Sequence, residues 1–197
     1  MSSDERERPQ KIRYSKLQEV QLTPLETLDR ATSEMYYAIG FDAAEVPPRS
    51  YGDLAMLGRT HSVHVAEADY QVAGYAAWRD ESPGVGFIAE VGVHPDYQRF
   101  GIGRGLYERI ETEARELGLK EIVVKVWDRA EWAVSFYRAL GFKQVDEKAP
   151  ERVSTWFEEK NAGQPLLRPG ESVLWVSVRP AQRLDDEGLD DEESGGD

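Results

Sequence analysis

The sequence has 197 residues, with 37 acidic and 24 basic side chains, a formal net charge of −13 and no cysteine. This length fits one domain with a substantial core, and the absence of cysteine excludes disulfides, thiolate metal sites and a cysteine nucleophile. The acidic balance argues against a general nucleic-acid binder, which needs basic surface to displace counterions from phosphate.

The sequence has no apolar run long enough to span a membrane and no apolar stretch after its N-terminus. We therefore expect no membrane association, no secretory signal peptide and a cytoplasmic location. The acidic surface is also typical of proteins from high-salt cytoplasm, where screening removes self-repulsion. The alternative is that an acidic tail, residues 181–197, accounts for much of the excess charge and is disordered.

The first third of the chain predicts a flexible terminus, a strand and a helix. Residues 1–12 are charged and lack an apolar pattern, which predicts a flexible N-terminus. Apolar and polar residues alternate from Leu17 to Leu22, which predicts a first strand. Residues 23–26 (TPLE) have the pattern of a capping box with proline at the first helical position, and predict a helix that runs to about Ile39.

A loop, a helix and two strands are predicted next. Pro47 and Pro48 lie in residues 40–50 and cannot continue a helix. A second short helix is expected at residues 51–60. Two strands, residues 62–68 and 71–79, should then be joined by a tight turn at Asp69 and Tyr70.

The next stretch, residues 86–105 (GFIAEVGVHPDYQRFGIGRG), begins as an apolar strand from Phe87 to Val93 that contains Glu90. Pro95 ends the strand, and a glycine-bearing turn leads to a helix with an apolar face that ends near Gly118. The first N–H groups of such a helix lack partners, and the helix dipole favours negative charge there. Because glycine allows close backbone approach and two arginines lie beside it, we expect the turn to bind a diphosphate.

The remaining elements alternate strands and helices. Strands are predicted at residues 122–127 and 143–147 and a last strand at 173–178, with an amphipathic helix at 150–160. That helix either caps the sheet or forms a wall of the acceptor site. Antiparallel strands followed by strand–helix–strand units predict an α/β fold, with a mixed, mostly antiparallel sheet and helices on both faces.

The turn does not match the common nucleotide-binding patterns. A dinucleotide fingerprint requires glycine where Leu106 lies, and no lysine occurs between Lys16 and Lys120 for a triphosphate loop. The pattern Q-x-x-G-x-G from Gln98 to Gly103, a few residues after V-x-V-x-P, resembles instead the acetyl-CoA loop of the GNAT N-acetyltransferases. Residues 133–142 (AVSFYRALGF) resemble the A-x-x-F-Y-x-x-L-G-F helix of the same family.

This resemblance covers about residues 15–180 and implies a GNAT domain at residues 13–180. It also implies transfer of an acetyl group from acetyl-CoA to an amine, on a small molecule or a protein, by direct attack on the thioester. Many relatives have asparagine where this chain has Ala130, which puts the contact made there in doubt. The implied acetyl-CoA-binding residues are Val91, Gly92, Val93, Gln98, Arg99, Phe100, Gly101, Ile102, Gly103, Arg104 and Phe136.

Two residues are candidates for acid–base catalysis. Tyr137 corresponds to the family tyrosine that protonates the departing thiolate; the alternative is a residue that only fills the core. Glu90 is the candidate base, directly or through water, because burial at a strand end raises a carboxyl pKa. The alternative is that Glu90 pairs with an arginine on a neighbouring strand.

Further side chains are weaker candidates. Asp42, Glu45 and Tyr51 could attract a cationic amine, although an ordinary solvated loop is the more common explanation. His61 and His64 are three residues apart but enter a strand without a carboxylate set, so no metal is expected.

Two other functions and a dimer remain open. A catalytically silent acyl-CoA-binding module shares the diphosphate turn, and Glu90 and Tyr137 favour the enzyme. A nucleotide-binding regulator lacks the required lysine and third glycine. Val173 and Trp175, on the last strand, could form the edge of a homodimer.

Overall fold

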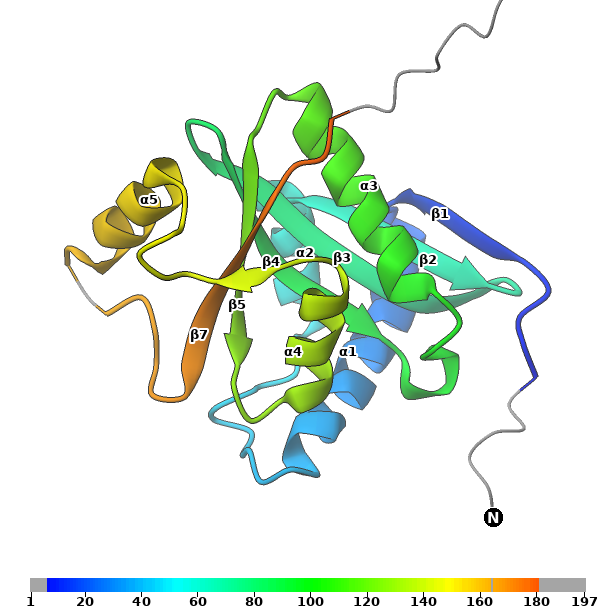
Figure 1. The fold of residues 1–197 in the computed structure, drawn as a ribbon. Helices are drawn as coiled ribbons and strands as arrows, with labels where there is room; N and C mark the ends of the chain where they lie inside the picture. The colour runs from blue at the N-terminus through cyan, green and yellow to red at the C-terminus, as the bar shows by residue number, and fades with distance from the viewer. Residues whose placement is uncertain (1–6, 164, 181–197) are drawn as a thin grey trace, which may run out of the picture.

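The computed structural model describes residues 7–163 and 165–180; the expected acidic tail, residues 181–197, lies outside them. The elements form one seven-stranded sheet in the order β1-β2-β3-β4-β5-β7-β6, in which only β4 and β5 pair in parallel (Figure 1). The strands are β1 Ile12–Lys16, β2 Ser62–Ala68, β3 Gln71–Ser82, β4 Val85–Val93, β5 Glu121–Trp127, β6 Lys143–Gln144 and β7 Glu171–Ser177. The helices are α1 Leu22–Tyr37, α2 Tyr51–Thr60, α3 Ile102–Glu116, α4 Glu131–Ala139 and α5 Glu151–Asn161.

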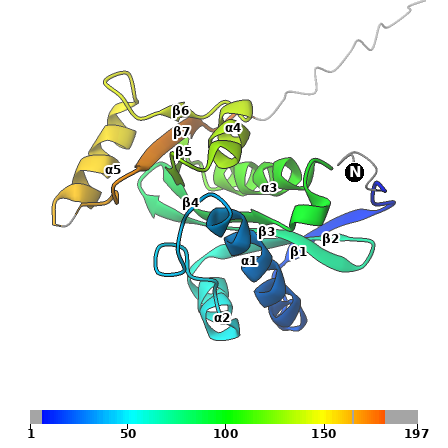
Figure 2. The same ribbon diagram turned by 90° about the horizontal axis from the view of Figure 1, so that it is seen from below.

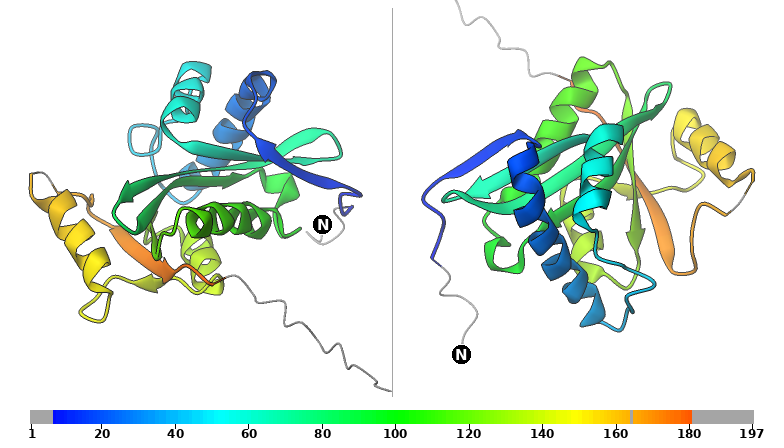
Figure 3. Two further views of the ribbon diagram at one scale, coloured as in Figure 1. Left: turned by 90° about the horizontal axis from the view of Figure 1, so that it is seen from above. Right: turned by 180° about the vertical axis from the view of Figure 1, so that it is seen from behind.

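Helices cover both faces of the sheet, as the sequence predicts. Helices α1 and α2 lie on one face and α3 on the other, which is clear when the sheet is seen edge-on (Figures 2 and 3). Strand alternation explains the separation. Tyr75 and Ala77 of β3 pack with α1 and α2, whereas Ala76 and Trp78 of the same strand pack with α3.

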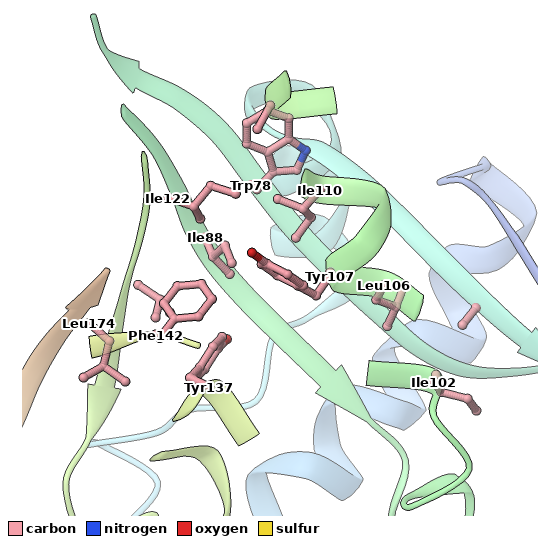
Figure 4. Close-up of a cluster of buried hydrophobic side chains, with 14 of the residues drawn as sticks. Trp78, Ile88, Ile102, Leu106, Tyr107, Ile110, Ile122, Tyr137, Phe142 and Leu174 are labelled. Carbon is pink, nitrogen blue, oxygen red and sulfur yellow. The ribbon is translucent and has the colours of Figure 1, made fainter. Parts of the chain in front are cut away.

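The largest core cluster lies between the sheet and helices α3 and α4 (Figure 4). Ile102, Leu106 and Ile110 of α3 are at most 1% exposed, because residues spaced by three or four form one helical face. Helix α5 packs on the opposite face of β5 and β7, where Val153 and Trp156 contact Val123 and Trp175. The mixed sheet with helices on both faces is therefore confirmed.

The predicted first strand is wrong. Strand β1 is Ile12–Lys16, and Leu22 already begins α1. Gln21 is the N-cap of α1 and makes no side-chain cap, so Thr23 is not the cap; the Gln18 backbone N–H donates to Gln21 Oε1 at 2.9 Å in the short 3-10 helix, Glu19–Gln21, that precedes α1. Leucines spaced three apart on α1 are buried, and this helical period outweighs the short alternation that suggested a strand.

The hairpin between β2 and β3 agrees with the prediction. Asp69 and Tyr70 both have positive φ, 47° and 70°, which is typical of the type I′ turn that matches strand twist. Asp69 also accepts hydrogen bonds from the backbone N–H groups of Gln10 and Lys11 at 3.1 and 3.0 Å. The N-terminal segment expected to be flexible is thus attached to the sheet edge from Gln10 onward.

The proposed dimer edge is not an edge. Strand β7 lies between β5 and β6, and Val173 and Trp175 are only 3% and 8% exposed within this chain. The long segment between β6 and β7 allows the chain to return between β5 and β6. The residues of β7 alone do not indicate this position in the sheet. In the described part of the chain, no helix is both long and apolar enough to cross a membrane.

A partly buried polar network joins α3 to strands β1, β2 and β3. Glu113 Oε2 accepts hydrogen bonds from Ser62 Oγ at 2.7 Å and from Trp78 Nε1 at 2.9 Å. The same oxygen lies 3.1 Å from His64 Nε2. The other carboxylate oxygen of Glu113, Oε1, forms an ion pair with Lys16. Burial alone would raise the pKa of Glu113, but the hydrogen bonds outweigh burial and lower it to about 2. His64 is therefore part of a structural network.

We expect Glu113→Gln to lower the free energy of unfolding by about 1–3 kcal/mol at pH 7. Because the folded-state pKa is lowered, this stabilisation is present above the unfolded-state value and is lost as the pH falls toward 2. Urea unfolding of both proteins at pH 7 and pH 3 measures the difference, with the exposed Glu116→Gln on the same helix as control. Equal midpoints for wild type and Glu113→Gln at pH 7 would contradict the expectation.

Candidate active site

A large cavity of about 1300 Å³ passes through the region where β4 and β5 separate. Its walls come from β4, β5, the start of α3, helix α4, the loop before α2 and helix α5. All the candidate catalytic and acetyl-CoA-binding residues line it except Phe100, which is half-buried outside the lining. The sequence-predicted residues are therefore brought together with that one exception.

The cavity exists because two parallel strands stop pairing. The register of β4 and β5 runs from Val85 with Glu121 to Ile88 with Val124 and ends there. Beyond this point, β4 remains paired with β3 and β5 remains paired with β7, so the two strands diverge (Figure 1). Backbone groups of β4 from Glu90 to Val93 consequently border the opening on their β5 side.

A register shift in β4 places Glu90 on the side of α1. Ala77 pairs with Glu90 and Trp78 pairs with Ile88, so Ala89 is the extra residue of a β-bulge. Such bulges redirect side chains and often lie beside functional sites. Glu90 shares the face of Ala77, which packs under α1 and α2.

The carboxylate of Glu90 belongs to a polar cluster on that face. It forms an ion pair with Arg49, which comes from the loop before α2 and also lies 3.8 Å from Asp29. Asp29 accepts hydrogen bonds from the Tyr75 hydroxyl at 2.6 Å and the Arg49 backbone N–H at 2.5 Å. Glu90 thus has an arginine partner, as the alternative interpretation held, but the arginine is not on a neighbouring strand.

Burial raises the pKa of Glu90 to about 7; the positive charge of Arg49 opposes this shift and the negative charge of Asp29 adds to it. The Glu90 side chain is still 24% exposed, because it borders the cavity. A group that titrates near neutral pH at the wall of a cavity can accept a proton there.

The glycine-bearing turn has the geometry of an anion site. Gly101 is the N-cap of the 15-residue helix α3, with φ of 84°, and Arg99 also has positive φ, 70°. An added Cβ at Gly103 would lie 3.0 Å from Phe136, so this glycine allows α4 to pack against the turn. Arg99 and Arg104 are exposed beside the helix start and line the cavity.

Gln98 positions the turn. Its side-chain amide donates to the Val93 carbonyl at 3.2 Å and lies 3.1 Å from the Met35 sulfur. The side chain therefore ties the end of β4 to the turn and to α1.

Tyr137 is buried but borders the cavity from α4. It is 5% exposed, and its ring lies edge-on to Phe136 and Phe142 at centroid distances of 5.0 and 5.2 Å. Burial raises the pKa of Tyr137 well above its usual value, and Tyr36 and Glu90 raise it further. Since Tyr137 and Glu90 come from opposite faces of the sheet, this electrostatic coupling acts through the gap between β4 and β5.

The loop before α2 does not carry free acids. Asp42 accepts hydrogen bonds from the backbone N–H groups of Ala44 and Glu45 at 2.8 and 2.9 Å, and Glu45 pairs with Arg129 at 3.3 Å. Tyr51 is exposed and outside the cavity lining. Among residues 7–163 and 165–180, no group of three or more possible ligands could hold a metal ion.

Sequence reasoning missed the residues that surround Glu90. Asp29 and Tyr75 are buried polar partners, and Arg49 comes from a proline-bearing loop. One signal was present: Asp29 lies four residues after Leu25, on the apolar face of α1, where an unpartnered carboxylate would be costly.

Ala130 is the position that departs from the resemblance. It is fully buried, precedes α4 and makes no side-chain cap, and its backbone N–H donates to the Trp127 carbonyl at 3.0 Å. Helix α4 forms without a capping side chain.

Comparison with known proteins agrees with this geometry. A sequence profile of the "Acetyltransferase (GNAT) family" matches residues 25–142. The chain is 34% identical over 99 residues to the amino-acid acetyltransferase of Azotobacter vinelandii, covering 50% of this chain and 20% of that protein. It is 30% identical over 131 residues to the IAA acetyltransferase of Azospirillum brasilense, covering 66% and 81%.

Solved structures share the fold at lower identity. The PaiA N-acetyltransferase from Thermoplasma acidophilum, solved with coenzyme A, superposes with a TM-score of 0.69 at 17% identity, covering 85% of this chain and 99% of that one. The N-acetylglutamate synthase of Neisseria gonorrhoeae gives 0.60 at 19%, covering 86% and 35%. The profile match spans more than half of the 197 residues, and the chain therefore belongs to the GNAT acetyltransferase family.

Proposed function

We propose that the protein is an N-acetyltransferase that uses acetyl-CoA to acetylate a primary amine. The observation that carries the proposal is the separation of β4 and β5, which opens one cavity from the start of α3 to Glu90. A diphosphate bound at the helix and an amine bound at Glu90 would then lie on the two sides of one opening in the sheet.

The residues at the helix start fit acetyl-CoA. The first N–H groups of α3, together with Arg99 and Arg104, would hold the diphosphate. The β4 backbone from Val91 to Val93 would hold the acetyl-pantetheine arm where β4 lacks a partner on its β5 side. Acetyl-CoA supplies the activated acetyl group as a thioester.

Glu90 would take the proton of the attacking amine, directly or through water. A pKa of about 7 gives a carboxylate that is present in quantity at neutral pH and still a useful base. Arg49 would hold the Glu90 side chain at the wall of the cavity.

Tyr137 would supply the proton to the departing thiolate, because its raised pKa keeps the hydroxyl protonated. We expect Tyr137→Phe to lower kcat by about 10²-fold with little change in the Kd of acetyl-CoA. Tyr107→Phe is the control, since Tyr107 is also buried and contacts Phe142, at 5.6 Å, but does not line the cavity; its hydroxyl donates instead to Glu111 at 3.3 Å. Equal kcat for Tyr137→Phe and wild type would show that Tyr137 only fills the core.

The names of the relatives support amine acceptors. Their names include amino-acid acetyltransferase and, for a protein of Escherichia coli that is 34% identical over 86 residues, L-amino acid N-acyltransferase MnaT. The chain spans 20% and 50% of the lengths of these two relatives, so the acceptor is inferred only as a primary amine.

The proposal is tested by mixing purified protein with acetyl-CoA and a panel of amines and peptides, and following CoA release with a thiol reagent. The protein has no cysteine and therefore no thiol background. Assays at low and multimolar salt address the acidic surface. Release with one acceptor class supports the enzyme, whereas acetyl-CoA binding by calorimetry without release from any acceptor would favour a silent acyl-CoA-binding module.

A further inference from the structure

A buried carboxylate close to the cavity has no role in the proposed mechanism. Asp29 is 2% exposed and lies on the buried face of α1 with Leu25 and Leu28, which are 0% and 1% exposed. Burying a carboxylate costs free energy, and an apolar residue of similar volume can fill such a site without that cost. Packing alone does not require the carboxylate, so its partners indicate what it does.

Both oxygens of Asp29 are engaged. Oδ2 accepts a hydrogen bond from the Arg49 backbone N–H at 2.5 Å, and Oδ1 accepts one from the Tyr75 hydroxyl at 2.6 Å. Oδ1 also lies 3.8 Å from Arg49 Nη1. Asp29 therefore contacts both the main chain and the side chain of one arginine, while Tyr75, which is fully buried on β3, holds the carboxylate from the sheet.

The hydrogen bond to Asp29 fixes Arg49 within the loop before α2. Pro47 and Pro48 precede it, so the Arg49 N–H is the first backbone donor after two residues that have none. Ser50 follows as the N-cap of α2. Because two prolines restrict the chain on one side and a helix start restricts it on the other, this hydrogen bond sets the point from which the Arg49 side chain extends.

The guanidinium of Arg49 links Asp29 to Glu90. The same nitrogen, Nη1, forms the ion pair with Glu90 Oε2 and lies 3.8 Å from Asp29 Oδ1. The Glu90 side chain is 24% exposed and that of Asp29 is 2% exposed, so the contacts run from the interior to the cavity wall. Asp29 itself is not among the residues that line the cavity, and it can act on a substrate only through Arg49 and Glu90.

We propose that Asp29 is a positioning residue for acetyl transfer: it holds Arg49 so that the guanidinium keeps the Glu90 carboxylate at the wall of the cavity. This inference rests on the proposed function, in which Glu90 takes the proton of the amine. Asparagine at position 29 would put an NH2 group where one of the two acceptor oxygens lies, so one contact is lost. The Arg49 side chain then regains rotamer freedom and holds Glu90 less well.

Asp29 also acts on Glu90 through its charge. Burial is the main cause of the raised pKa of Glu90; Arg49 opposes the shift, and the negative charge of Asp29 adds to it. The neutral Asp29→Asn therefore lowers the pKa of Glu90. The Tyr75 hydroxyl lowers the pKa of Glu90, so Tyr75→Phe raises it.

Both variants leave the other charged and titratable groups around Glu90 in place. Those that line the cavity on the surrounding elements are Tyr36 of α1, Arg79 and Glu81 of β3, Lys125 of β5, Tyr137 of α4 and Lys160 of α5. A change in the titration of Glu90 can therefore be assigned to the substituted residue.

The two variants give opposite shifts in the CoA-release assay. We expect Asp29→Asn to lower kcat by about tenfold, with the acceptor KM and the Kd of acetyl-CoA nearly unchanged, and to move the rise of kcat/KM below pH 7. Tyr75→Phe breaks a hydrogen bond to the same carboxylate but should move the rise above pH 7. Glu34→Gln, the same change of charge at an exposed residue of α1, is the control and should match wild type. Wild-type kcat and pH profile in Asp29→Asn, or a shift in the direction of Tyr75→Phe, overturns the inference.

Two further measurements do not depend on turnover. Carbon-13 NMR titration, with the Glu90 carboxyl signal identified by its absence in Glu90→Gln, should give a lower midpoint in Asp29→Asn than in wild type. Hydrogen exchange of the Arg49 amide needs no variant and should be slowed by about 10²-fold or more relative to an unstructured peptide. An unprotected Arg49 amide or an unchanged Glu90 midpoint overturns the inference. If both results are as expected but no amine releases CoA, only the proposed function fails.

Discussion

Replacing Glu90 with glutamine is expected to lower kcat by about 10²- to 10⁴-fold and to leave the Kd of acetyl-CoA nearly unchanged. Glutamine keeps the size and one oxygen of the side chain but cannot take a proton from the amine. The residues proposed to bind acetyl-CoA lie on β4 from Val91 onward, in the turn before α3 and on α4, so we expect their positions not to depend on the charge of Glu90. Steady-state kinetics and calorimetry together separate the two quantities.

The pH dependence gives a more specific signature. Because the base must be deprotonated and burial raises its pKa to about 7, kcat/KM should rise with pH through about 7 and then level off. Rates are expressed per concentration of unprotonated amine, so that the titration of the acceptor is removed. The rise near pH 7 should be absent in Glu90→Gln.

Arg49→Met distinguishes a base from an anchor. If Glu90 only held Arg49 in place, Arg49→Met and Glu90→Gln would lose similar activity, since both break the same ion pair. If Glu90 is the base, Arg49→Met retains more activity. Removing the positive charge also raises the pKa of Glu90, so the rise in kcat/KM moves to higher pH. Matching losses and matching pH profiles would contradict the assignment.

The conformation of the parts of the site that are contiguous in sequence could be predicted. The glycine-bearing turn needs only Gln98 to Gly103 and the following helix, and the observed positive φ and close approach are both local properties. The helix with Tyr137 is also local: residues 133–142 resemble the family helix, and Gly141, which has φ of 95°, follows the end of α4.

The surroundings of Glu90 could not be predicted. Asp29, Arg49 and Tyr75 come from a helix, a loop and a strand that are distant in sequence, and only the folded sheet joins them. The wrong first strand has a related cause: short alternation at residues 17–22 competed with a helical period that becomes visible only beyond Leu25. The interior position of β7 depends on its pairing with β5 and β6, and the residues of β7 alone do not show which strands it pairs with.

Gly101→Val is expected to weaken acetyl-CoA binding by about 10- to 100-fold. Gly101 has φ of 84°, where a β-branched residue is strained, and it sets the position of the first N–H groups of α3. A helix terminus contributes about 0.3–2 kcal/mol to anion binding, and hydrogen bonds to a charged group about 1.5–3 kcal/mol, which together account for this loss.

Gly118→Val separates lost binding from backbone strain. Gly118 follows the other end of α3, has φ of 75° and, like Gly101, has no heavy atom within 4 Å of an added Cβ. Both variants should therefore lower the free energy of unfolding by about 1–2 kcal/mol, since both force a side chain into the left-handed region. Only Gly101→Val should change the Kd of acetyl-CoA measured by calorimetry. If Gly118→Val weakened binding equally, the loss would come from a distorted helix; if neither did, the diphosphate would bind elsewhere.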